Sequence, residues 1–221
     1  MSKVKAYQLP PTKLIPNSPH PLLHYPGFFD LEADHVTAAE VSDLFAKNGW
    51  QTQWIFRYGE TQRSHYHSQA HECMVVLSGS ASIRFGVADT DPDLQINTYG
   101  AAREHGGIEL AAQPGDVFVI PAGVAHKTHD TVPAAPFKLL TPGSGHAPIL
   151  REALQKIELD GFTMIGAYPR DSGAWDFAEG GEHAGNFEQV WSVPKPKRDP
   201  VMGSDGGLAT LWETEGQNQL G

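Results

Sequence analysis

Two groups of residues have the side chains and the spacing of a metal site, and the first contains His65, His67 and Glu72. Alternate residues of an extended strand project to the same face, so the two imidazoles point the same way, about 7 Å apart at the backbone. The residues at 68–70 allow the chain to turn, so that a carboxylate returns on the next strand. Two histidines and one carboxylate therefore converge on one point.

The second group lies further along the chain, where Gly115 is followed by Pro121-Ala122-Gly123 and then by His126. Pro121 and Gly123 suit positions i+1 and i+3 of a type I turn. The segment is therefore expected to form a strand, a tight turn and a returning strand. His126 stands at the start of the returning strand and is the remaining ligand candidate.

This donor set favours a transition metal. Three neutral imidazoles and one carboxylate suit Fe, Mn, Co, Ni, Cu or Zn, whereas Ca and Mg prefer oxygen ligands. Four protein ligands on an octahedral ion leave two positions for water, O2 or a chelating substrate. We therefore expect one divalent transition metal ion on His65, His67, Glu72 and His126, in a site that can be catalytic.

His71 is the alternative to Glu72 as a ligand, because the two residues are neighbours in the sequence. Alternation along a strand points them to opposite faces, so only one of them can face the other ligands. The spacing of six residues between Glu72 and Gly79 favours Glu72.

Tyr58 and Arg84 are candidate catalytic residues outside the ligand set. Trp54, Phe56 and Tyr58 share one face of an expected strand, where they form either core or pocket wall, and the Tyr58 hydroxyl is a possible proton donor. Arg84 would clamp a substrate carboxylate if its face of the strand turned inward.

The elements around these residues are expected to be short strands. The chain has 23 Gly and 17 Pro, too many for a helical bundle. Runs rich in β-branched and aromatic residues indicate an all-β sandwich or barrel. We expect a single domain over residues 1–221, with an N-terminal arm at 1–36, a barrel at 50–170 with insertions at 88–107 and 132–160, and a C-terminal tail at 171–221 packed on the barrel.

Helices are expected only at the periphery. Thr37 and Glu40 have the spacing of a capping box and predict a helix at about 38–48. The insertion at 132–160 contains an amphipathic segment whose apolar face carries Leu150, Leu154 and Ile157. We consider two hypotheses for this insertion, a lid over the barrel mouth or packing on the outer wall or a partner subunit.

Charge argues against some partners. The chain has 16 basic and 26 acidic residues, a net charge of -10 and a pI near 5.5. Such a charge repels phosphate backbones and anionic membrane surfaces, so we expect neither nucleic acid nor a membrane as partner. Cys73 has no second cysteine to pair with, which is typical of a reducing compartment. We expect a soluble, cytoplasmic protein.

Both groups of residues resemble the paired motifs of the cupin superfamily, and four segments narrow the resemblance to the YjlB-type single-domain cupins. These segments are FAKNGW at 45–50, HYHSQAHE at 65–72, GDVFVIPAGVAHK at 115–127 and GAYP at 166–169. The resemblance implies an RmlC-like double-stranded β-helix, or jelly-roll, barrel with a few short peripheral helices. It also implies that His65, His67, Glu72 and His126 bind the metal inside the barrel. The chain has Asp130 where the second motif often ends in Asn.

Cupin barrels include dioxygenases, isomerases and decarboxylases, so the resemblance implies a non-haem metal-dependent enzyme that acts on a small organic molecule. The alternative is a non-catalytic barrel that binds a metal or a small ligand. Because cupins often pair, a homodimer is also expected.

Overall fold

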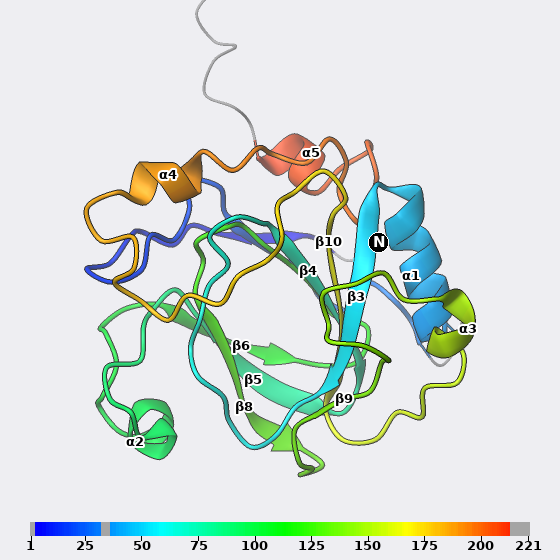
Figure 1. Cartoon of the computed structure of the whole chain (residues 1–221), viewed down its shortest axis with the longest axis horizontal. Coiled ribbons are helices and arrows are strands. Elements are labelled where there is room, and N and C mark those ends of the chain that lie inside the picture. Colours follow the sequence, from blue (N-terminus) through cyan, green and yellow to red (C-terminus); the bar gives the residue numbers. More distant parts are fainter. Residues whose placement is uncertain (1–2, 32–35, 213–221) are drawn as a thin grey trace, which may run out of the picture.

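A computed structural model describes residues 3–31 and 36–212 of the chain, which form two antiparallel sheets facing one another (Figure 1). The larger sheet has the order β1-β2-β7-β4-β10-β3-β9 and the smaller one β6-β5-β8. The strands are β1 (Lys5–Tyr7), β2 (Leu22–Tyr25), β3 (Trp50–Arg57), β4 (Glu72–Ser78), β5 (Ser80–Phe85), β6 (Ile108–Ala112), β7 (Val117–Ile120), β8 (His126–Val132), β9 (Lys138–Leu139) and β10 (Thr163–Pro169).

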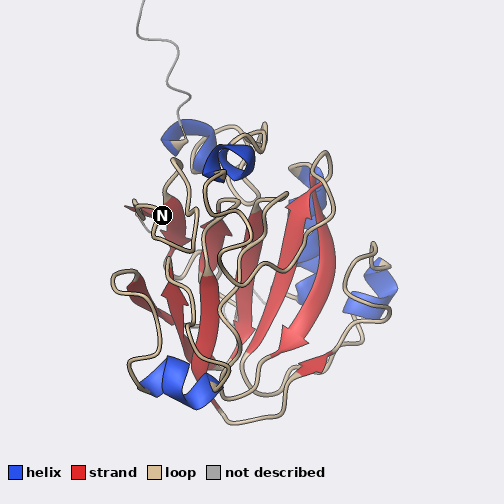
Figure 2. Ribbon diagram, turned by 60° about the vertical axis from the view of Figure 1, so that its left-hand side comes forward, coloured by secondary structure: helices blue, strands red, loops and turns tan. Residues whose placement is uncertain are grey.

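Helices are short and peripheral (Figure 2). They are α1 (Ala38–Lys47), α2 (Leu94–Tyr99), α3 (Arg151–Leu154), α4 (Phe187–Trp191) and α5 (Leu208–Leu211). The expected all-β jelly-roll barrel with a few short helices is therefore confirmed. None of the helices in the described ranges has the length and apolar character needed to cross a bilayer.

Alternation along β4 divides the apolar side chains between two cores. Met74 and Val76 point inward, into the cluster between the two sheets. Cys73 and Val75 point outward, into a cluster that α1 covers through residues such as Phe45. Because side chains alternate along a strand, residue 72 lies on the same face as Met74 and Val76, and residue 71 on the same face as Cys73 and Val75. Glu72 therefore faces the barrel interior.

The capping residues of α1 behave as the sequence predicts. The backbone N–H of Thr37 donates to the Glu40 carboxylate at 2.7 Å, and the N–H of Glu40 donates to the Thr37 hydroxyl at 3.3 Å. Both bonds satisfy N–H groups that the first turn leaves without partners. The helix ends at Lys47, and Gly49 takes a φ of 85° that favours glycine.

The N-terminal arm contributes two strands to its own barrel, a pairing that the sequence did not reveal. β2 pairs antiparallel with β7, with Leu23 opposite Val119, and β1 pairs with β2. The arm extends the large sheet beyond β7, and Leu22 and Leu23 are fully buried there.

The insertion at 132–160 has two parts in the structure. Helix α3 packs against α1, with Leu154 3% exposed in the outer core and Arg151 bonded to Asp43 at 2.9 Å. Leu150 is 77% exposed, so the apolar face predicted for this helix is wrong at that position. The other part, around Gly145 and His146, lies against Trp175 of the tail.

The described part of the C-terminal tail lies along the arm. The indole N–H of Trp212 donates to the carbonyl of Pro21 at 2.8 Å, and that of Trp191 donates to the carbonyl of Pro16 at 3.1 Å. Each indole buries a large apolar area, and its hydrogen bond avoids the cost of burying an unpaired N–H. The boundaries proposed for arm, barrel and tail stay predictions.

Candidate metal centre

A pair of backbone hydrogen bonds brings the two sequence motifs together. The N–H of His65 donates to the carbonyl of His126 at 3.1 Å, and the reverse bond measures 2.8 Å. The two imidazole centroids are 4.4 Å apart as a result. The turn before His126 is fixed as well, because the N–H of Gly123 donates to the carbonyl of His67 at 2.8 Å.

Gly123 is required at that turn for two reasons. Its φ is 88°, and a Cβ at this position would lie 2.4 Å from the carbonyl oxygen of Asn17. Any other residue would strain the backbone and push the arm away. The glycine of the second motif therefore sets the position from which His126 enters the barrel.

His65, His67 and His126 form a buried cluster whose ligand atoms lie within 4.8 Å of one another. Each Nδ1 faces a backbone carbonyl oxygen, and these belong to Arg63 at 3.2 Å, to Asp176, and to Val124 at 3.2 Å. A carbonyl only accepts, so each Nδ1 carries the proton of its bond. The Nε2 atoms are thereby directed to the centre, as in metal-bound histidines.

Glu72 completes the cluster from the start of β4. Its Oε1 lies 3.3 Å from Nε2 of His67, and its Oε2 lies 3.2 Å from Nε2 of His126. The Tyr168 hydroxyl donates to Oε1 at 2.5 Å, whereas Oε2 is buried and has no hydrogen-bond partner in the described part of the chain. A buried carboxylate oxygen without a partner is costly, and a cation at the centre would satisfy it.

The protonation states suit a cation. Burial would raise the pKa of Glu72, but the charge and hydrogen bond of His67, with help from His126 and Tyr168, lower it to about 2. Burial holds the pKa of His65 well below its usual range, and it also lowers the pKa of His126. Burial lowers the pKa of His67, but the Glu72 charge more than offsets this and raises it, so a bound ion would displace a proton there.

Tyr168 owes its position to Gly166 and Trp54. A Cβ at Gly166 would lie 2.0 Å from the Trp54 ring, so only glycine lets the indole lie across β10. The indole N–H then donates to the Tyr168 oxygen at 3.0 Å. The segment GAYP thus has a physical explanation, although no pattern in the sequence indicates that Tyr168 contacts a ligand residue.

Two aromatic residues of the tail cover the histidines. Phe177 stacks on His65 with centroids 3.8 Å apart, and Trp175 lies edge-on to His67 at 5.3 Å. Between them, the Asp176 carboxylate accepts hydrogen bonds from the N–H and hydroxyl of Ser68 at 2.6 and 2.7 Å. We call residues 175–177 the aromatic cover. Sequence reasoning placed the tail aromatics on the barrel but had no signal to place them over the metal ligands.

Comparison with known proteins agrees with this geometry. A family model described as Cupin matches residues 59–139, which contain both histidine motifs. The uncharacterized protein YjlB of Bacillus subtilis (strain 168) is 26% identical over 216 residues, which cover 95% of this chain and 97% of that protein. The chain has the cupin fold and is similar to YjlB.

Solved structures similar to this cupin include two that contain small molecules. The oxalate decarboxylase formate complex of Lactobacillus farciminis is 13% identical, with a TM-score of 0.29, and the match covers 57% of this chain and 27% of that one. RmlC of Streptococcus suis, in complex with dTDP-D-xylose, is 10% identical with a TM-score of 0.31, and the match covers 76% of this chain and 70% of that one. The cupin described here thus spans less than a third of the oxalate decarboxylase chain.

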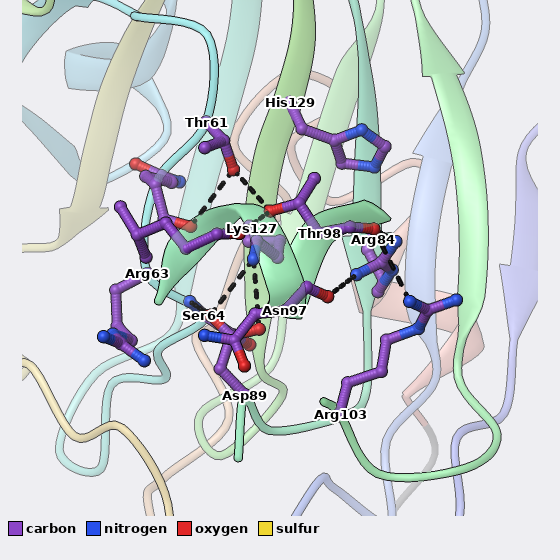
Figure 3. A network of polar contacts seen from close by, with 12 residues as sticks. Thr61, Arg63, Ser64, Arg84, Asp89, Asn97, Thr98, Arg103, Lys127 and His129 are labelled. Atoms are coloured by element: carbon purple, nitrogen blue, oxygen red, sulfur yellow. Dashed lines mark hydrogen bonds and ion pairs between the residues drawn. The ribbon is translucent and has the colours of Figure 1, made fainter. Parts of the chain in front are cut away.

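Of the other candidates in this cupin, Tyr58 lies near the metal centre and Arg84 does not. Tyr58 is buried in the inner core, and burial together with the Glu72 charge holds its pKa well above the usual range. Arg84 points out of the barrel, since its neighbours Ile83 and Phe85 point in. Figure 3 shows its guanidinium on the carbonyl oxygens of Asn97 and Thr98, at 3.1 and 2.9 Å.

His71 and Asp130 also lie apart from the ligands. The His71 ring lies 5.0 Å from that of Trp212, and its Nδ1 accepts the N–H of Ala122 at 3.0 Å. Asp130 has a φ of 54°, a left-handed conformation that Asn and Asp tolerate better than most residues. Asp130 thus suits the conformation at this position.

Proposed function

We propose that this cupin binds one divalent transition metal ion through His65, His67, Glu72 and His126, and uses it in an enzymatic reaction on a small organic molecule. One observation carries the proposal. Three buried imidazoles are oriented by carbonyl oxygens so that Nε2 faces inward, and the buried Oε2 of Glu72 beside them has no partner among the described residues. A divalent cation among them would satisfy all four groups at once.

The donor set supports Fe, Mn, Co, Ni, Cu or Zn. Such an ion would supply Lewis acidity toward the oxygens of a chelating substrate, or a position for O2. The reaction type within this range, whether of the dioxygenase, isomerase or decarboxylase kind, stays a hypothesis, as do the homodimer and the cytoplasmic location.

The chain's own residues have three tasks under this proposal. Tyr168 holds the Glu72 carboxylate through its hydrogen bond to Oε1. The aromatic cover keeps bulk water from the histidines, of which His65 is 7% exposed. Tyr58, whose raised pKa keeps its proton in place across the neutral range, is the candidate proton donor near Glu72.

A non-catalytic metal or small-ligand barrel is the second candidate, and two features favour it. The space between the sheets is occupied by apolar side chains, among them Phe85, Phe118 and Phe162. The aromatic cover also lies against two of the histidines, with Phe177 on His65 and Trp175 on His67. Both candidates require the same four ligands.

A turnover experiment separates the two candidates. Metal-loaded wild-type protein and the His126→Ala variant would be incubated with a mixture of small hydroxy, keto and dicarboxylic acids, with and without O2, and analysed by mass spectrometry. Depletion of one component by the wild type alone is the expected result. Metal-dependent binding of a component without any depletion would favour the non-catalytic barrel, and wild-type protein that takes up no metal would contradict both.

A further inference from the structure

A basic pocket lies outside the barrel, between the end of α1, the end of β10 and the segment that leads to α5. Its volume is about 600 Å³. It is lined by five basic residues and one acidic residue, Asp171, although the whole chain has 16 basic and 26 acidic residues. The basic residues are Lys47, Arg170, Lys195, Lys197 and Arg198.

These five cations have no carboxylate within 4 Å in the part of the chain that the structure describes. Some other cations of the described chain do form close pairs, as in Lys127 with Asp89 at 3.0 Å and Arg84 with Glu109 at 3.3 Å. Like charges gathered in one concave place repel one another, and an anion relieves that repulsion. The pocket thus has the electrostatics of a site for a negatively charged molecule.

Backbone contacts hold the walls of the basic pocket in place. The N–H of Arg170 donates to the carbonyl of Gly49 at 3.0 Å, and the carbonyl of Arg198 accepts the indole N–H of Trp50 at 2.9 Å. Trp50 is only 1% exposed, so it anchors the wall to the outer core. Because these segments are tied to the barrel, the pocket exists before a ligand arrives.

Two of the five cations already donate to backbone carbonyls. Lys195 donates to the carbonyl of Ala209 at 3.2 Å, and Arg198 donates to that of Lys47 at 3.4 Å. Arg170 and Lys197 are exposed and line the same cavity. An arginine offers a planar pair of donors and a lysine a point charge, which is the combination that phosphate oxygens accept well.

We propose that the basic pocket binds a soluble small molecule that carries a phosphate or pyrophosphate group, at a site separate from the metal centre. None of the four proposed metal ligands lines this pocket. The net charge of -10 opposes an extended polyanion such as nucleic acid, whereas a small anion meets mainly the local field. The pocket volume suits a ligand of metabolite size.

The test is calorimetric titration of the full-length protein with inorganic pyrophosphate at low salt, after removal of metal by a chelator and dialysis. One-to-one binding is expected in the wild type, and at least tenfold weaker binding in R170Q/K197Q, whose altered side chains are exposed. The matched control is K138Q/K156Q, because Lys138 and Lys156 line a second surface pocket that also holds Glu152, Glu158 and Asp160. That variant removes the same charge and should bind like the wild type.

Three results would overturn the proposal. The wild type could fail to bind pyrophosphate once metal is removed, which would assign any binding to the metal centre. Both double variants could weaken binding equally, which would indicate a general charge effect. Finally, the protein could sediment with vesicles of phosphatidylcholine and phosphatidylglycerol and lose this property in R170Q/K197Q alone, which would assign the pocket to a membrane surface.

Discussion

The Tyr168 hydroxyl on β10 donates a 2.5 Å hydrogen bond to Oε1 of Glu72 on the neighbouring strand β4. The indole N–H of Trp54, on the other side of β10, donates to the same hydroxyl at 3.0 Å. The two bonds form a chain across three strands that fixes one carboxylate oxygen and leaves Oε2 facing the histidines. Orientation of a ligand by groups behind it is a usual property of metal sites.

Replacement of Tyr168 by Phe should therefore weaken metal binding by about 10- to 100-fold. The Glu72 carboxylate would lose its positioning bond, and the Trp54 N–H would lose its acceptor at a cost of about 1–3 kcal/mol. Competition with a fluorescent chelator would measure the affinity. Tyr58→Phe is the control, because no hydrogen bond links that hydroxyl to Glu72 in the described structure, and equal affinity losses in both variants would contradict this explanation.

Replacement of Asp176 by Ala should open the aromatic cover. The variant loses the two bonds from Ser68 that hold the cover over the histidines. The metal content should stay near that of the wild type, because His67 bonds to the backbone carbonyl of residue 176, which the substitution keeps. Removal of the metal by a chelator should become several-fold faster. Asp171→Ala, at an exposed carboxylate near the cover in sequence, serves as control. Unchanged chelator kinetics in the Asp176 variant would show that the cover does not limit access.

The helix of the insertion is expected to stabilise the barrel from outside. Leu154→Ala should cost about 2–5 kcal/mol in free energy of unfolding, because the side chain is 3% exposed between α3 and the outer core. Leu150→Ala should change it by less than about 0.5 kcal/mol, because that side chain is 77% exposed. Urea denaturation of the two variants measures this difference. A loss of free energy of unfolding in Leu150→Ala as large as that in Leu154→Ala would contradict the packing of α3 described above.

Stability should fall in mild acid, in part through His71. Burial and the nearby His20 lower the pKa of His71 from 6.5 to about 4. Between these values the unfolded chain binds a proton that the folded chain does not, so the free energy of unfolding falls as pH drops from 6.5 to about 4, by roughly 3 kcal/mol in all.

His71→Asn should flatten that part of the stability curve, measured by urea denaturation of the metal-free protein at several pH values. The exposed His105→Asn is the control and should leave the curve's shape unchanged. A His71→Asn curve parallel to that of the wild type between pH 6.5 and 4 would be inconsistent with a buried neutral His71.

Local patterns revealed the barrel strands well. The runs rich in β-branched and aromatic residues do form strands, among them β3, β5 and β6, because such residues and their alternation depend directly on which face of a strand is buried. Alternation indicated that His71 and Glu72 face opposite sides, and the spacing to Gly79 favoured Glu72 as the inward residue. β4 places Met74 and Val76 on that same inward side.

The remaining features depend on contacts between distant segments. Residues 175–177 reach the histidines from an irregular tail segment that has no repeating pattern, and β2 joins β7 across more than ninety positions of sequence. Arg84 could not be assigned to a face until the pairing of β5 was known. Turns and irregular segments have no repeating pattern of apolar residues, so the sequence does not show which way the chain runs through them.

The most direct test of the metal centre is elemental analysis of the purified protein and four variants. Close to one transition ion per chain is expected in the wild type and in His71→Ala, and strong loss is expected in His65→Ala, His126→Ala and Glu72→Ala. His71→Ala is a stringent control because it alters the residue next to Glu72 on the opposite face of the strand. Equal metal content in all five proteins, or loss in His71→Ala with retention in Glu72→Ala, would contradict the proposed ligand set.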